Sequence, residues 1–202
     1  MITLHQTKTG DVTFQETMSG PFAIGVTDPA EATKIAAGHT GWRLTLHARV
    51  TVSGDGPGAL SGEVRLSDAR APIPFEGGTF LLFPTGGDSD SDSDGDGEPV
   101  RHELMRYELS FDGGRYRLIG FKTAGQRPFV ARLWPDTTTL YTRLSRDGDV
   151  IGAGVLHLGV ANLARLVASI RAPGAHTPAD AARAIGGFAL RFTRGVAEAY
   201  LR

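Results

Sequence analysis

Glu16 is a charged residue at a position where the sequence pattern predicts the inside of a β-sheet protein. The stretch Val12–Met18 alternates, so Glu16 shares one face with Val12, Phe14 and Met18, because successive side chains of a strand point to opposite faces. A carboxyl group in an apolar interior is poorly solvated, which suits it to acid or base chemistry near neutral pH. The competing interpretation is a structural Glu16 that pairs with a cation, since buried charges are usually paired.

Lys122 is the second charged candidate for such chemistry. In the strand predicted over 115–123 it lies on the face of Tyr116, Leu118 and Gly120. It can pair with Glu16 or bind an anionic group of a ligand, and the alternative is a lysine that leaves a strand end toward solvent. We name Glu16 and Lys122 as the candidate catalytic pair.

Polar and aromatic residues around the Pro135 corner are candidates for ligand contacts. Trp134 offers an amphipathic surface for a flat ligand at the mouth of a barrel, and Asp136 either meets that ligand or caps the turn. The other candidate ligand contacts are Thr138, Tyr141, His157 and Tyr107. Each has a structural alternative, because a buried hydroxyl can bond a neighbouring backbone group, a tyrosine can pack in the core, and a strand histidine can face either side.

Several kinds of chemistry find no support in the sequence. There is no cysteine, which excludes disulfides, thiolate metal sites and cysteine nucleophiles. No pair of histidines has metal-ligand spacing, and no Gly-rich phosphate loop, GxSxG or HExxH motif occurs. We therefore predict neither a metal site nor a cofactor.

The segment 86–99 contains the low-complexity acidic run DSDSDSDGDGE. This composition predicts a mobile loop between two strands. The alternative is calcium binding, because Asp90, Asp92 and Asp94 imitate the start of an EF-hand loop. The twelfth position would be Arg101 where that loop needs a bidentate acid, so we favour the mobile loop.

Alternating hydrophobicity dominates the first 160 residues and predicts about nine or ten strands joined by short turns. The clearest runs from Trp42 to Ser53, with an apolar and a polar face. Ser19-Gly20-Pro21 is expected to separate two strands, and Asp28 to Gly38 to form a short helix with Asp28 as its cap. A further short strand is expected over 129–134. The fold class is mainly β: an antiparallel barrel, lipocalin-like or calycin-like, over about 10–160. A β-sandwich is the alternative.

The tail from 161 to 202 changes to a helical period. The first helix is expected over 162–171 with Asn162 as its cap, and a second begins after Thr177 with Pro178 at its first position. Gly186-Gly187 weakens this second helix, so close packing is expected to compensate. We expect both helices to cover an open end or side of the sheet, within one domain that spans 1–202.

Composition sets the broad class. The 202 residues carry a formal net charge of −1, so no overall basic field favours nucleic acid. The N-terminus has no apolar signal-peptide core, and no run of about 18 apolar residues occurs. These features predict a cytoplasmic protein with no membrane span.

Four segments carry a family resemblance: 14–20 (FQETMSG), 120–122 (GFK), 133–141 (LWPDTTTLY) and 152–157 (GAGVLH). They resemble an accessory domain that accompanies GMC-type (cholesterol-oxidase-like) flavin oxidoreductases and α/β-hydrolase segments in actinobacteria, and the resemblance covers about 12–172. This chain has neither the dinucleotide fingerprint nor the nucleophile elbow of those enzymes. The resemblance implies an oxidoreductase partner and a role in steroid, lipid or other hydrophobic metabolism.

Three functions are consistent with these features. The first is binding of a hydrophobic small molecule, such as a steroid, terpenoid or polyketide, inside the barrel. The second is cofactor-independent cyclisation or isomerisation of a hydrophobic substrate, with Glu16 and Lys122 as acid and base. The third is a purely structural or partner-binding domain whose barrel is packed solid.

Overall fold

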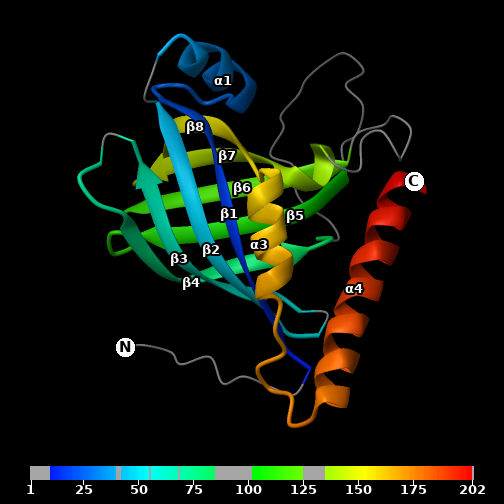
Figure 1. Cartoon of the computed structure of the whole chain (residues 1–202). Coiled ribbons are helices and arrows are strands. Elements are labelled where there is room, and N and C mark those ends of the chain that lie inside the picture. The colour runs from blue at the N-terminus through cyan, green and yellow to red at the C-terminus, as the bar shows by residue number, and fades with distance from the viewer. Residues whose placement is uncertain are drawn as a thin grey trace.

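Eight antiparallel strands form a closed barrel in the computed structural model, which describes residues 10–39, 42–54, 56–67, 69–84, 102–124 and 135–201 (Figure 1). Each strand pairs with the next along the chain, and β8 pairs back onto β1. The strands are β1 (Val12–Ile24), β2 (Arg43–Val52), β3 (Gly58–Leu66), β4 (Ile73–Leu82), β5 (His102–Phe111), β6 (Tyr116–Ala124), β7 (Thr139–Arg146) and β8 (Asp149–His157). The mainly β prediction and its antiparallel barrel are confirmed, and the alternative sandwich does not form.

Alternation of apolar and polar side chains produces this barrel. In β2 every second residue from Leu44 to Val52 is buried, and the residues between them are exposed or half-buried. The β5–β6 hairpin turns through Asp112, Gly113 and Gly114, all with positive φ, as tight hairpins require. Local sequence therefore determines both the strand faces and this connection.

The expected break at Ser19-Gly20-Pro21 is wrong, because β1 continues through it and changes neighbours there. Residues 12–21 pair with β2, and residues 19–24 pair with β8. A Cβ on Gly20 would overlap the carbonyl oxygen of Val155, so a glycine permits this close approach of β1 and β8. One long strand, Val12–Ile24, thus replaces two expected ones. The strand expected over 129–134 and the acidic loop over 86–99 lie outside the described residues.

Helix α3 (Val160–Ser169) covers the part of β1 that β8 leaves unpaired. Within the described chain, strand pairing between β1 and β8 is confined to Ser19–Ile24. Along the rest of β1 the backbone bonds to α3 and to the residues just after it. These hydrogen bonds join Thr13 N–H to Arg171 O (2.9 Å), Arg171 N–H to Thr13 O (2.9 Å), Gln15 N–H to Ser169 Oγ (2.8 Å) and Asn162 Nδ2 to Thr17 O (3.1 Å).

The expected cap of this helix is also wrong. Helix α3 begins at Val160, after Gly159, and its N-terminus has no side-chain cap. Asn162 lies inside the first turn, where its amide donates to the Thr17 carbonyl of β1. A tertiary hydrogen bond to a strand thus replaces the local one that the sequence pattern suggested.

The other two labelled helices lie at different sides of the barrel (Figure 1). Helix α1 (Pro29–Ala37) is capped by Asp28, as predicted, with Glu31 N–H 2.7 Å from Asp28 Oδ1. It packs outside the β1–β8 seam, where Ala23, Ala32 and Ala153 are fully buried. Helix α4 (Pro178–Leu201) is the C-terminal helix. None of the described helices is long and apolar enough to cross a membrane.

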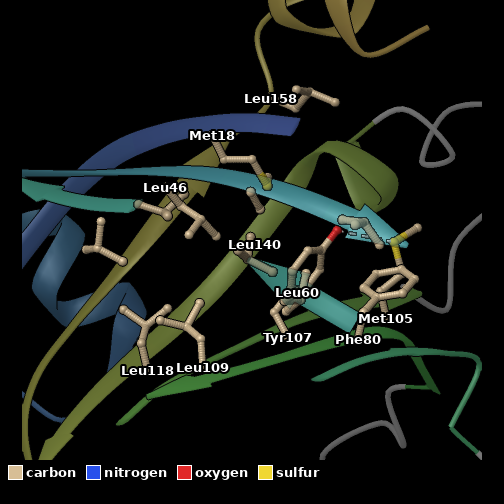
Figure 2. Packing of buried hydrophobic residues seen from close by; sticks show 14 of the residues in the cluster. Met18, Leu46, Leu60, Phe80, Met105, Tyr107, Leu109, Leu118, Leu140 and Leu158 are labelled. Carbon is tan, nitrogen blue, oxygen red and sulfur yellow. Dashed lines mark hydrogen bonds between the residues drawn. The ribbon is translucent and has the colours of Figure 1, made fainter. Parts of the chain in front are cut away.

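One half of the barrel interior is filled by side chains. Figure 2 shows Leu46, Leu109 and Leu118 in this packed part, and Tyr107, Met105 and Phe80 gathered beside Leu60. The leucines are 0–1% exposed, as in an ordinary close-packed core. The interior beyond Tyr107 differs, because it is bounded by helices as well as strands.

Candidate functional site

A cavity of about 340 Å³ lies where the barrel interior meets α3 and α4. The barrel supplies most of its deeper wall. The strands contribute Phe14, Glu16, Phe80, Leu82, Met105, Tyr107 and Lys122, and the adjoining segments contribute Thr137, Thr138 and Leu158. The helices supply the remaining wall: Leu163, Leu166, Val167 and Ile170 from α3, and Ile185, Phe188, Ala189, Phe192 and Thr193 from α4. The lining is thus mainly aliphatic and aromatic, with a few polar groups.

Three polar side chains meet at one part of the cavity wall. Lys122 Nζ donates to Glu16 Oε1 at 2.7 Å, and the Tyr107 hydroxyl donates to Glu16 Oε2 at 2.6 Å. The side chains of Glu16 and Lys122 are 3% and 2% exposed, and Tyr107 is 1% exposed. Three strands supply them, because the inward positions of β1, β5 and β6 converge at this depth. We call these three residues the polar cluster.

The charges of the polar cluster compensate one another. Glu16 and Lys122 form an ion pair in an otherwise apolar wall, which offsets the cost of removing each charge from water. The Lys122 ammonium also lies 5.4 Å from the centre of the Tyr107 ring, within the range of a cation–π contact. Burial raises the pKa of Tyr107 well above its usual value, and the Glu16 carboxylate raises it further. Tyr107 therefore stays a neutral hydrogen-bond donor.

Aromatic contacts hold α4 beside the cavity. The ring centre of Phe188 lies 5.9 Å from that of Phe14 in β1, and the ring centre of Phe192 lies 6.2 Å from that of Phe83. Val167 of α3 lines the cavity and is nevertheless 58% exposed. The cavity therefore has a mouth on the helical side, bordered by Val167 and by Ala189 of α4.

Four of the predicted site residues line this cavity: Glu16, Lys122, Tyr107 and Thr138. Asp136 does not line it, although it is 8% exposed. Its Oδ2 atom accepts a hydrogen bond of 2.6 Å from the hydroxyl of Tyr200 in α4. Asp136 thus anchors the C-terminal helix to the helical turn over residues 135–138.

Two other predicted ligand contacts lie outside the barrel. Tyr141 is half-buried on the outer face of β7, where its ring stacks on that of Phe121 at 5.8 Å. His157 is exposed, and its Nδ1 atom lies 3.3 Å from Thr139 Oγ1. Neither side chain reaches the cavity, because inward-facing Leu140 and Leu156 occupy the alternate positions of these strands. Trp134 lies outside the described residues.

The helical part of the wall was not predicted as a site. The apolar stripe that includes Ile185, Phe188 and Phe192 predicts an amphipathic helix packed on the barrel. The same pattern suits a solid interface and a cavity wall equally well, so it does not by itself indicate a site. Among the described residues, no group of three or more histidine or acidic side chains is placed to hold a metal ion.

No family model, curated protein or solved structure matches this chain. The functional argument therefore rests on the geometry and chemistry of the cavity.

Proposed function

We propose that this chain binds a hydrophobic small molecule in the cavity between the barrel and its two C-terminal helices. The observation that carries the proposal is the composition of the wall: apolar side chains from three strands (β1, β4 and β5) and two helices surround one buried polar cluster. Ligand sites combine a mostly apolar surface with a few polar groups that orient the ligand.

The size of the cavity limits the ligand. Its volume of about 340 Å³ is near the lower end of small-molecule sites, which run from roughly 300 to 1,000 Å³. A compact terpenoid or a short polyketide fits this range better than a whole steroid, unless part of the ligand projects through the mouth at Val167. The eight-stranded barrel is of the size that holds one small ligand in lipocalins, which supports the lipocalin-like mode of binding that we propose.

A second candidate function is cofactor-independent cyclisation or isomerisation of the bound molecule. It is favoured by the convergence of Glu16 and Lys122 in one cavity. Lys122 would stabilise negative charge that develops on a substrate oxygen, and Glu16 would accept a proton. Each Glu16 oxygen already accepts one hydrogen bond, so a substrate proton would have to approach one of the remaining lone pairs of the carboxylate. Catalysis therefore places stricter geometric demands on the bound molecule than binding does.

Association with a flavin oxidoreductase is a further part of the proposal. It rests on the resemblance of 12–172 to domains that accompany such enzymes. A domain that holds a hydrophobic ligand next to a redox enzyme would suit such an association. The purely structural alternative is less favoured, because it supposes a barrel packed solid, whereas this barrel contains a cavity with a buried ion pair in its wall.

The proposal is tested by titration with N-phenyl-1-naphthylamine, a neutral apolar dye that fluoresces when it leaves water. We expect saturable binding to the wild-type chain, with displacement by terpenoids. Ala189→Trp places bulk at the mouth and should weaken dye binding at least tenfold. The matched control is Ala182→Trp, at an exposed α4 position that does not line the cavity, and it should bind as the wild type does. The absence of saturable binding to the wild type would contradict the proposal.

A further inference from the structure

We propose that the ligand carries a neutral hydrogen-bond acceptor, a carbonyl oxygen, which binds to Nζ of Lys122. This inference rests on the proposed function, because it specifies the chemistry of a molecule bound in the same cavity. It is carried by the hydrogen bonds of the polar cluster and by its net charge.

The first step is the number of donors on Lys122. An ammonium group has three N–H donors and no acceptor. In the part of the chain that the structure describes, Glu16 Oε1 is the hydrogen-bond acceptor that Nζ meets, and the face of the Tyr107 ring is its other neighbour. Donor capacity thus remains on Lys122, a residue that lines the cavity and whose side chain is only 2% exposed.

The second step is that the other two members of the polar cluster already have partners. The Tyr107 hydroxyl gives its hydrogen to Glu16, and each Glu16 oxygen accepts one hydrogen bond. Among the described residues of this cluster, the group with an unused hydrogen is therefore the Lys122 ammonium. A buried donor without an acceptor is costly, so a ligand that supplies an acceptor oxygen gains affinity over one of the same shape that supplies none.

The third step is charge. Glu16 and Lys122 cancel, and Tyr107 is neutral, so the polar cluster has no net charge. A carboxylate ligand would bring an uncompensated negative charge into an apolar cavity and place it beside Glu16. An amine ligand would bring a second cation next to Lys122. A carbonyl oxygen accepts hydrogen bonds without either cost and has no donor of its own to satisfy.

The experiment compares three ligands with equal chain length: 2-decanone, decane and decanoate. Each competes with N-phenyl-1-naphthylamine for the full chain at pH 7.5. We expect 2-decanone to bind roughly tenfold more tightly than either of the others, since hydrogen bonds to charged groups are the stronger ones. In Lys122→Met this preference for the ketone over decane should disappear while the dye still binds.

Two further measurements guard against a variant that fails to fold. The double variant Glu16→Gln/Lys122→Met removes both charges together and should also lose the ketone preference. In the wild type, the infrared stretch of 2-decanone labelled with ¹³C at its carbonyl should move to lower wavenumber on binding, as it does when the oxygen accepts a strong hydrogen bond.

The outcomes separate this inference from the proposed function. If the dye and all three ligands bind but 2-decanone shows no preference, or if decanoate binds most tightly, the carbonyl inference is overturned and hydrophobic binding stands. If neither the dye nor any of the three ligands binds, the proposed function fails and the inference fails with it. If the preference for the ketone persists in Lys122→Met, the ketone oxygen binds to a donor other than Lys122, and the inference is also overturned.

Discussion

At the scale of single residues, the polar cluster is the part of the cavity wall that is expected to be most sensitive to substitution. Its two charges lie in an apolar environment, so each depends on the other for compensation. A buried ion pair adds little stability compared with an apolar pair, but loss of one partner leaves an isolated buried charge. The energetic consequence of a substitution here therefore depends on whether the partner is changed too.

Lys122→Met is expected to lower the free energy of unfolding by about 3–5 kcal/mol, because Glu16 is left buried and uncompensated. Glu16→Gln/Lys122→Met should cost clearly less than the two single variants together. Chemical denaturation of the four proteins measures the coupling. The matched control is Arg117→Met, which breaks the exposed 2.7 Å pair with Glu108 and should cost at most about 1 kcal/mol. Additive effects of the two cavity substitutions would contradict the expected coupling.

Tyr107 should lose its proton at a higher pH than an exposed tyrosine does. Its pKa is raised well above the usual value by burial and by Glu16. The contribution of neutral Tyr107 to the free energy of unfolding is fully present below the tyrosine pKa of the unfolded state. It is lost as the pH rises through the higher pKa of the folded state. In an ultraviolet titration of the four tyrosines, we expect one phenolate to appear late, together with unfolding by base. Tyr107→Phe should remove that late step, and a late step that persists would have to come from another tyrosine.

Residue facings were largely predictable from sequence, and residue contacts were not. Alternation alone places Glu16 and Lys122 inside, since each shares a face with apolar neighbours. Their contact depends on how far β1 and β6 are brought together by closure of the barrel, and no local pattern encodes that distance. Tyr141 and His157 show the converse, because their types suit a ligand site but their strand positions point outward.

At the scale of elements, α4 is held to the barrel by a small number of specific contacts. Phe188 and Phe192 pack on Phe14 and Phe83, and Tyr200 bonds to Asp136. Within α4, Val196 is buried (3% exposed), whereas Leu190 on the outer side is 71% exposed. The approach of α4 to the barrel also depends on Gly195, because a Cβ there would overlap the ring of Phe83.

Glycine-to-alanine substitutions in α4 should have opposite effects at two positions. At Gly186 a Cβ would meet no atom within 4 Å, so Gly186→Ala should stabilise the protein by up to about 1 kcal/mol through helix propensity. Gly195→Ala gains the same propensity but forces α4 away from Phe83, with a net cost of about 1–3 kcal/mol. Thermal unfolding compares the two, and a stabilised Gly195→Ala would show that α4 does not need this close contact.

The existence of the helices was predictable from their apolar period, but the role of α3 was not. The side chains of Asn162 and Ser169 bond to the backbone of β1, more than 140 residues earlier in the chain. A sequence pattern describes Asn162 as a helix cap, because cap preferences are local. The Thr17 carbonyl, which binds the Asn162 amide instead, can be identified only from the three-dimensional arrangement of β1 and α3.

At the scale of the whole molecule, the closed barrel and the helical wall should differ in local stability. The strands are joined in a continuous hydrogen-bonded ring, whereas α4 depends on side-chain contacts at a few positions. Regions with few buried contacts open with less free energy than the core.

Hydrogen exchange followed by mass spectrometry should therefore show slow exchange in β1–β8 and faster exchange in α4. Addition of 2-decanone should slow exchange in α3 and α4, since both helices line the cavity, and should leave α1 unchanged. Helix α1 is the internal control, because it lies over the other part of the seam. Equal protection of α1 and α4 upon ligand addition would indicate a general effect on stability rather than binding in the cavity.

The hydrogen bonds between β1 and α3 have a consequence for the fate of damaged or shortened chains. Without the segment after Leu158, the backbone groups of Thr13, Gln15 and Thr17 that now meet α3 would form an open strand edge, and such an edge recruits strands from other molecules. Loss of residues 162–171 by proteolysis is therefore expected to promote self-association, whereas a cut after Arg171 leaves these contacts in place. Covering this strand edge is thus a role of the C-terminal segment that is independent of any ligand.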